Sequence, residues 1–207
     1  MLITKLERQK KNHKRFNLYL DGEFYCGLYD DTLLKYGIAS GDEVTEKQIE
    51  EIRGFDEYIY GKKIAFDYLS YRIRTISEIR KRLKKTKLQD ETINKVISHL
   101  KELKLVDDEA FARQLVAEKI KNKPAGKRMI EKKLFEMGIP KQVGESVLDE
   151  LLDEETEKSL ALKVYEKFSP KISGLDKQEA RKKIFAKLAS RGFNFDIINE
   201  IIREKAE

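Results

Sequence analysis

The chain has 207 residues, of which 40% are apolar and 39% are charged, and its formal net charge is +6. This composition supports one or two folded domains, and it excludes a membrane span because no window approaches the roughly 20 apolar residues that a transmembrane helix needs. The N-terminus lacks the apolar core of a signal peptide, and Cys26 is the single cysteine. We therefore expect a cytoplasmic protein with no internal disulfide, in which Cys26 is a buried strand residue.

The charges are distributed unevenly along the chain. Residues 1–60 carry 9 Lys and Arg against 12 Asp and Glu, residues 61–141 carry 22 against 11, and residues 142–207 carry 12 against 14. The excess of positive charge therefore belongs to the middle segment. Such an asymmetry indicates a localised surface for a polyanion, either nucleic acid or an acidic protein groove.

The N-terminal residues alternate between apolar and polar side chains, which is typical of strands. The alternation covers 16–20 and again 23–29, and Asp21-Gly22 between them is a favoured two-residue hairpin turn. We predict a β-hairpin here. A third strand over residues 2–9 is expected, because an isolated hairpin is only marginally stable in water.

Two short helices are predicted to follow the strands. The first covers 31–36, and the second covers 46–58 and begins at a capping box formed by Thr45 and Gln48. Together with the strands they form a small α+β module over residues 1–60.

An Ile-x-x-x-Leu pattern occurs three times in the rest of the chain. Its copies are Ile79–Leu83, Ile130–Leu134 and Ile184–Leu188, which are offset by 51 and then 54 residues. Each copy is followed by a break and a further amphipathic run. A glycine marks the break in the second and third copies, and a lysine takes its place in the first. A period of about fifty residues with this pattern predicts tandem helical repeats.

Each repeat reads as three helices whose starts carry capping residues or proline. The predicted starts are Lys62, Thr75 with Glu78, and Asp90 in the first repeat; Asp107, the residues after Gly126, and Pro140 in the second; and Thr156, Asp176 with Glu179, and Asn194 in the third. The helix that starts at Lys62 is predicted to end at Ile73.

The predicted fold class is mainly α, with tandem three-helix repeats that form an elongated curved array behind the small α+β N-terminal module. The repeats are predicted over residues 61–105, 106–153 and 154–207. A three-helix unit of this size closes only a small core, so we expect stacking on neighbouring repeats to supply part of its stability.

The search for catalytic and metal-binding residues is negative. His13 and His99 have no cysteine or second histidine at ligand spacing, and Gly126-Lys127 lacks the remaining residues of a phosphate-binding loop. The adjacent acids Asp107-Asp108 at a predicted helix start are typical of helix caps rather than of an acid-base pair. We expect no catalytic residue, no cofactor and no metal, and hence a protein that is not an enzyme.

Basic residues gather at corresponding positions of the first two repeats. They can be read as ordinary solvated faces, but their correspondence and the nearby Tyr68 and Tyr71, which can stack on bases, favour a binding surface. Arginine is the stronger candidate because its planar fork pairs with phosphate or carboxylate at two points. The acidic run 149–157 is interpreted as a solvated link between repeats, with pairing to the basic middle as the alternative. The candidate binding residues are Arg72, Arg74, Arg80, Arg82, Lys84, Lys85, Lys123, Lys127, Arg128 and Lys132.

Three stretches resemble the RecX family, the regulators of the RecA recombinase. They are AFDYLSYRIRTISEIRKRL at 65–83, LVDDEAFARQLV at 105–116 and GKRMIEKKLFEMGI at 126–139. The resemblance implies a non-catalytic protein of tandem three-helix units that binds in the groove of the RecA–DNA filament. It also implies that the protein modulates, and usually inhibits, ATP hydrolysis, strand exchange and the coprotease activity of the filament. Residues 1–60 match less specifically, and no role is transferred to them.

We therefore expect a monomer that binds the RecA filament and holds single- or double-stranded DNA on its basic surface, with a role in recombination, DNA repair and the SOS response. Two alternatives stay open. The chain can be an autonomous DNA-binding regulator in which a repeat works like a helix-turn-helix module, or a basic helical scaffold for another acidic protein.

Overall fold

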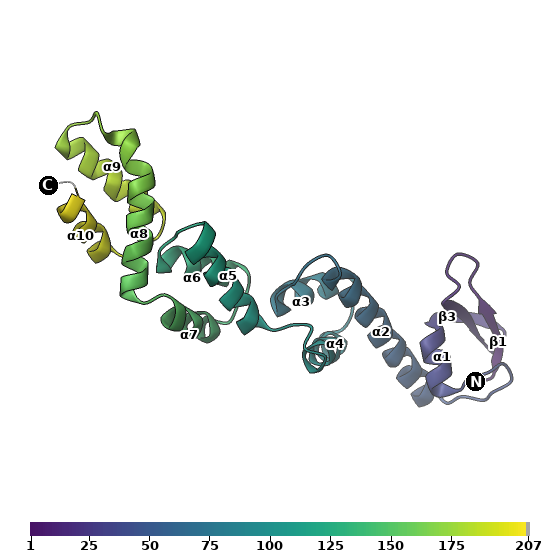
Figure 1. Cartoon of the computed structure of the whole chain (residues 1–207). Helices are drawn as coiled ribbons and strands as arrows, with labels where there is room; N and C mark the ends of the chain where they lie inside the picture. The colour runs from purple at the N-terminus through teal and green to yellow at the C-terminus, as the bar shows by residue number, and fades with distance from the viewer. Residues whose placement is uncertain (206–207) are drawn as a thin grey trace. The chain divides into compact units, whose positions relative to one another are not determined.

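The computed structural model describes residues 1–205. These residues form a three-stranded antiparallel sheet followed by ten α-helices and one 3-10 helix (Figure 1). The chain divides into two compact units. Unit 1 comprises Met1–Ile73 and Ile79–Leu105, and unit 2 comprises Arg74–Glu78 and the residues from Val106 onward. The predicted mainly helical fold with a small N-terminal sheet is confirmed.

The sheet consists of β1 (Ile3–Arg8), β2 (Arg15–Leu20) and β3 (Glu23–Tyr29), in that order. Both the predicted hairpin and the predicted third strand are therefore correct. Asp21 and Gly22 connect β2 to β3 with φ angles of 47° and 92°. Two successive positive φ angles match the right-handed twist of the flanking strands, which is why Asp-Gly is favoured in this turn.

The core of the N-terminal module lies between the sheet and two helices, α1 (Asp30–Tyr36) and the first half of α2 (Glu46–Leu69). Ile3 of β1, together with Ile49 and Ile52 of α2, is buried in this core. The capping box predicted for the start of α2 is present, because Thr45 and Gln48 bond reciprocally. The first half of α2 therefore packs on the sheet and covers its apolar face.

The two helices predicted over 46–58 and 62–73 are in fact the single helix α2, which is 24 residues long. The predicted break fell beside Gly61, which is buried. A Cβ atom at this position would lie 3.0 Å from the Val96 side chain. Val96 belongs to α4 (Asp90–Glu102), which packs on the second half of α2. Gly61 thus allows close helix packing, and this packing offsets the roughly 1 kcal/mol that glycine costs inside a helix.

A buried carboxylate ties α2 to the end of the sheet. Asp56 is 7% exposed, and its Oδ1 atom accepts hydrogen bonds from the backbone N of Tyr29 at 2.6 Å and from the Thr32 hydroxyl at 2.7 Å. Arg15 Nη2 lies 3.9 Å from the other carboxylate oxygen. Burial raises the pKa of Asp56, although both hydrogen bonds and Arg15 oppose that shift. The carboxylate therefore satisfies two buried donors at a cost in desolvation.

The remaining helices follow in groups of three, with α2 as the first helix of the first group. They are α3 (Ile76–Lys84) and α4; then α5 (Asp108–Asn122), α6 (Lys127–Glu136) and α7 (Lys141–Leu151); then α8 (Glu154–Phe168), the 3-10 helix η1 (Ser169–Ile172), α9 (Lys177–Ser190) and α10 (Phe195–Lys205). The side chains of Asp107 and Asp176 cap α5 and α9 as predicted.

Two predicted helix starts are wrong, one by three residues and the other by one. Helix α8 begins with Asp153 as its cap, because the Asp153 carboxylate accepts from the backbone N of Thr156 at 2.8 Å. Thr156 therefore lies inside the first turn instead of preceding it. Pro140 is the cap residue of α7 and does not lie in its first turn.

The three repeats share one backbone feature at the end of their second helix. Lys87, Gly138 and Gly192 have φ angles of 62°, 77° and 80°. All three are left-handed, as expected at the C-terminus of a helix. The first repeat, which lacks the glycine, is therefore regular in its backbone. The second and third repeats also share one continuous hydrophobic core, which runs from Ala112 to Ile201.

Candidate functional site

The start of α6 is held by the third repeat. The backbone N of Gly126 donates to the Arg191 carbonyl at 2.9 Å, and the backbone N of Arg128 donates to the Gly192 carbonyl at 3.2 Å. Between them, the backbone N of Lys127 donates to Glu157 Oε1 at 2.9 Å. Glu157 is only 6% exposed, so a buried carboxylate of the third repeat caps a helix of the second.

The start of α3 is held in a similar way by the second repeat, within unit 2. The Thr75 hydroxyl donates to the Met137 carbonyl at 2.8 Å, and the backbone N of Ile76 donates to Asp108 Oδ1 at 2.9 Å. Ser77 lies against Gly138, since a Cβ atom added at Gly138 would be closer than 2.5 Å to the Ser77 side chain. We call this arrangement the repeat joint. In it, the residues at the start of the second helix of one repeat donate hydrogen bonds to the turn that ends the second helix of the next repeat, and a carboxylate of that next repeat accepts from a backbone N–H at the helix start.

Two predicted binding residues of the first repeat contact neighbouring groups of their own segment. The Arg72 guanidinium donates to the Ile73 carbonyl at 2.8 Å. The Arg82 guanidinium lies 6.0 Å from the centre of the Tyr68 ring. Tyr68 is therefore a partner of Arg82 in this structure, whereas Tyr71 is 83% exposed and is available for stacking.

The other predicted cations of the first repeat differ in their surroundings. Lys84 pairs with Asp90 at 3.2 Å. Arg80 is half-buried and Lys85 is exposed, and neither has an acidic partner among residues 1–205. Arg74 belongs to unit 2, where its side chain is 14% exposed and lies 3.6 Å from Glu78.

In the second repeat, the side chains of Lys127 and Arg128 are both engaged by groups of the same unit. Lys127 Nζ lies 2.5 Å from Asp149. The Arg128 guanidinium lies 4.9 Å from the centre of the Phe195 ring, which stacks on Phe185 with 5.7 Å between ring centres. These two cations thus contact α7 and α10, respectively.

The acidic run 149–157 contacts the basic middle at three points, two of which are ion pairs, as in the alternative that sequence reasoning left open. Besides the Asp149 pair and the Glu157 cap, Glu150 accepts two hydrogen bonds from Arg113, at 2.6 and 2.8 Å. These pairs raise the pKa of the Arg113 guanidinium and lower the pKa of the Glu150 carboxyl. Part of the basic excess of the second repeat is therefore neutralised within the chain.

A second basic cluster surrounds a cavity of about 330 Å³ between the second and third repeats. We call it the basic pocket. Its lining includes six cations and no acid: Lys123, Lys163, Lys167, Lys171, Lys187 and Arg191. Of these cations, the sequence reasoning predicted only Lys123. The signal was present in residues 158–191, which carry ten Lys and Arg against three Asp and Glu. The preceding acidic run cancelled this excess when charges were summed over 142–207.

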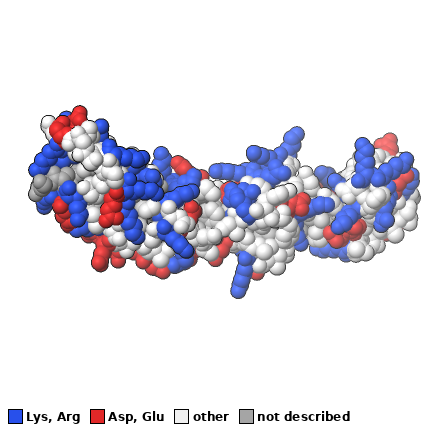
Figure 2. All heavy atoms as spheres, turned by 45° about the horizontal axis from the view of Figure 1, so that its top comes forward, with Lys and Arg blue, Asp and Glu red and all other residues white. Residues whose placement is uncertain are grey.

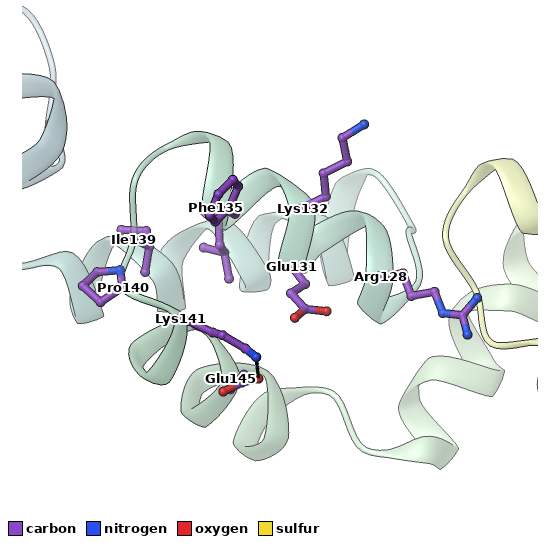
Figure 3. Close-up of a pocket in the computed structure, with 10 residues that line it drawn as sticks. Arg128, Glu131, Lys132, Phe135, Ile139, Pro140, Lys141 and Glu145 are labelled. Atoms are coloured by element: carbon purple, nitrogen blue, oxygen red, sulfur yellow. Dashed lines mark ion pairs between the residues drawn. The ribbon is translucent and has the colours of Figure 1, made fainter.

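An apolar hollow of about 290 Å³ lies between α6 and α7 in the second repeat. We call it the Phe135 groove. Phe135 at its edge is 77% exposed, and Ile139 and Pro140 contribute further apolar lining. Figure 3 shows Phe135 and Lys132 projecting to the same side of α6, upward in the view, and the Lys141–Glu145 ion pair of α7 below that helix.

Charged side chains are scattered over the surface of both units. Figure 2 shows groups of Lys and Arg side chains along the whole face in view, with acidic side chains and uncharged areas among them. Within the described range 1–205, no cluster of three or more His, Cys, Asp or Glu side chains is arranged to hold a metal ion. The helices of the same range include none with the length and apolar character of a membrane span.

Four family models match the chain in order. They describe the regulatory protein RecX N-terminal domain over residues 1–45 and the first, second and third three-helix domains of RecX over residues 62–100, 107–148 and 155–202.

Known proteins and solved structures resemble the chain over most of its length. Regulatory protein RecX of Staphylococcus aureus (strain Newman) is 32% identical over 202 residues, which cover 98% of this chain and 74% of that protein. The same protein of strain JH9 gives the same values. A crystal structure of regulatory protein RecX has a TM-score of 0.76 at 28% identity and covers 99% of both chains. The crystal structure of RecX from Lactobacillus salivarius has a TM-score of 0.67 at 28% identity, and the match covers 72% of this chain and 96% of that one. With all four domain models in sequence and a relative of this identity along nearly its full length, this chain belongs to the RecX family of regulatory proteins.

Proposed function

We propose that this chain regulates the RecA recombinase by binding the RecA–DNA filament as a monomer in the cytoplasm. In this proposal, binding lowers ATP hydrolysis, strand exchange and the coprotease activity of the filament. The observation that carries the proposal is the ordered match to all four RecX domains. The relatives are named regulatory proteins, in keeping with action on a partner and not on a small substrate.

The structure offers two kinds of surface for such a partner. Cations without an acidic partner suit phosphate or carboxylate groups, because an unpaired cation gains more from an incoming anion than one already neutralised. The Phe135 groove suits protein, because exposed aromatic side chains beside a cavity are typical anchors of protein interfaces. We propose that the groove receives an apolar side chain of a RecA subunit.

The central experiment is a titration of DNA-stimulated ATP hydrolysis by RecA with the full chain. We expect hydrolysis to fall as the chain approaches the stoichiometry at which it covers the filament. An unchanged rate across a stoichiometric titration contradicts the proposal.

Variants with matched controls separate the two kinds of surface. Phe135→Ala should weaken filament binding at least about tenfold, because central aromatic anchors contribute roughly 2 kcal/mol or more. Leu34→Ala is the control, since Leu34 is 81% exposed and lines neither of these cavities. Equal binding by both variants would remove the groove from the interface.

The predicted cations of the first repeat need a revised test. Replacing Arg74 disturbs its contact with Glu78, so Arg80→Glu with Lys85→Glu is the better pair. The control pair is Lys101→Glu with Lys104→Glu, which makes the same charge change on exposed side chains of unit 1. Weaker filament binding by the first pair alone supports the predicted surface.

The second candidate function is autonomous DNA binding, which the basic pocket favours. The two functions respond differently to salt. Binding to bare DNA through phosphate contacts falls steeply with salt concentration. A chain that also contacts RecA protein should keep its affinity for the filament at salt concentrations where bare-DNA binding has gone, and parallel loss of both affinities favours the second function.

A further inference from the structure

The lining of the basic pocket carries only positive charge. Among residues 1–205, no ion pair involves Lys163, Lys167, Lys171 or Arg191. Lys123 reaches Glu118 only at 4.0 Å, and both side chains are largely exposed. Like charges gathered around one hollow repel each other, and with no acid in the lining an anion from outside relieves that repulsion.

The pocket also has an apolar wall. Val164 and Phe168 of α8 and Pro124 of the α5–α6 connection line it beside the cations. Lys187 Nζ lies 5.6 Å from the centre of the Phe168 ring, which holds this ammonium group over the wall. A wall of this kind accommodates the sugar of a nucleotide while the cations contact its phosphates.

The elements that form the pocket are fixed in relation to one another. The cations come from α8, η1, α9 and the end of α5, and the repeat joint links the last two regions through the Gly126–Arg191 hydrogen bond. Val164, Ile172 and Ala125, which neighbour the pocket residues in sequence or lie among them, belong to one buried core. The cations therefore need little reorganisation when a ligand arrives.

We propose that the basic pocket binds phosphate groups, either those of a polynucleotide backbone or those of a free nucleotide. The inference rests on the proposed function in one respect: it identifies where the chain would contact the DNA of a filament. It also moves the principal phosphate contact from the cations predicted in the first two repeats to the junction of the second and third repeats.

The test uses the full chain and a fluorescein-labelled single-stranded oligothymidine, with fluorescence anisotropy measured over a range of salt concentrations. The pocket variant is Lys163→Gln with Lys167→Gln. The matched control is Lys182→Gln with Lys183→Gln, which removes the same charge from exposed residues of α9 outside the pocket lining. Circular dichroism melting curves check that both variants fold.

The salt slope gives the expected size of the effect. Each phosphate contact with single-stranded DNA contributes about 0.7 to the slope of log K against log salt concentration, so the pocket variant should lose about 1.4. The control should keep the wild-type slope. Equal losses in both variants indicate diffuse attraction and overturn the proposal, as does a wild-type chain that binds neither the oligonucleotide nor ATP.

Competition with ATP and with inorganic tripolyphosphate identifies the source of the phosphate. Displacement of the oligonucleotide at low competitor concentration supports a free nucleotide as the ligand, and resistance to displacement supports the backbone. RecA ATPase assays separate this proposal from the proposed function. A chain that inhibits RecA but has no salt-sensitive pocket refutes only the pocket, whereas a pocket that binds phosphate without any effect on RecA refutes only the RecA regulation.

Discussion

Replacing Gly138 with alanine tests the repeat joint directly. The alanine would have to adopt a φ angle of +77°, and its Cβ atom would overlap the Ser77 side chain. The left-handed conformation costs a non-glycine residue about 1–2 kcal/mol, and overpacking costs about 1–3 kcal/mol, so the substitution should destabilise unit 2 by about 2–5 kcal/mol.

A double-mutant cycle separates the two contributions. Ser77→Gly removes the side-chain atoms that the alanine would meet, while the backbone strain at Gly138 remains. We expect Gly138→Ala to cost about 1–3 kcal/mol less in the Ser77→Gly background than in the wild type. Gly174→Ala is a control in the same unit, because a Cβ atom there would have no neighbour within 4 Å.

The assay is urea denaturation followed by far-ultraviolet circular dichroism. Hydrogen exchange of peptides from residues 106–205 then localises the effect to unit 2. A cost below about 1 kcal/mol for Gly138→Ala would refute the close contact, because even the backbone strain would then be missing. A full cost with no relief from Ser77→Gly would refute the assignment of Ser77 as the obstructing residue.

Further predictions concern Asp56, Glu157 and Cys26, whose polar groups are buried or partly buried. Asp56→Ala should destabilise unit 1 by roughly 1–3 kcal/mol in urea denaturation because it leaves two buried donors unsatisfied, whereas Asp56→Asn keeps an acceptor and should cost less. Burial raises the folded-state pKa of Asp56, so its contribution to the free energy of unfolding should fall as pH rises above the unfolded pKa of roughly 3.9. Asp56→Asn should abolish that pH dependence, and identical pH profiles of stability for the wild type and this variant would contradict the reasoning. Glu157→Ala should cost about 1–3 kcal/mol by leaving the partly buried Lys127 amide without an acceptor, and Glu157→Gln should retain most of that stability. Equal losses in the two variants would exclude the cap. Cys26 is partly buried, and this burial raises the pKa of its thiol to about 11. Iodoacetamide should therefore label it about 100-fold more slowly than an exposed thiol at mildly alkaline pH, and rapid labelling of the folded chain would contradict this shielding.

The sequence predicted well those parts of the fold that depend on neighbouring residues. The Asp21-Gly22 turn and the Asp107 cap are set by side chains that act within three residues of themselves. The break predicted beside Gly61 failed because the same residue type serves two purposes. Glycine ends a helix where φ is positive and admits a neighbouring helix where it is not, and only the position of Val96 decides between them.

The candidate site was predicted less well, since it depends on residues that are distant in sequence. The basic pocket joins Lys123 to Arg191 across more than one repeat, and no period in the sequence indicates that these side chains face one hollow. Lys127 was predicted as a binding residue, and the structure places it against Asp149. The prediction that the ten cations bind RecA or DNA stays a prediction. Their surroundings separate cations that already have an acidic partner, such as Lys84 and Lys127, from those that have none among residues 1–205, such as Arg80 and Lys85.

The repeat joint has a consequence for how the chain is made. Gly126 has no side chain with which to cap α6, so the start of this helix depends on Glu157 and on the carbonyls of Arg191 and Gly192. During synthesis the N-terminal part of a chain emerges first and begins to fold first. The second repeat, which ends at residue 153, would therefore leave the ribosome with the first turn of α6 incomplete, and about forty more residues would have to follow before Gly192 could close that turn. In a nascent chain stalled before Glu157, we expect the backbone N–H groups of this turn to stay exposed after the rest of the second repeat has folded.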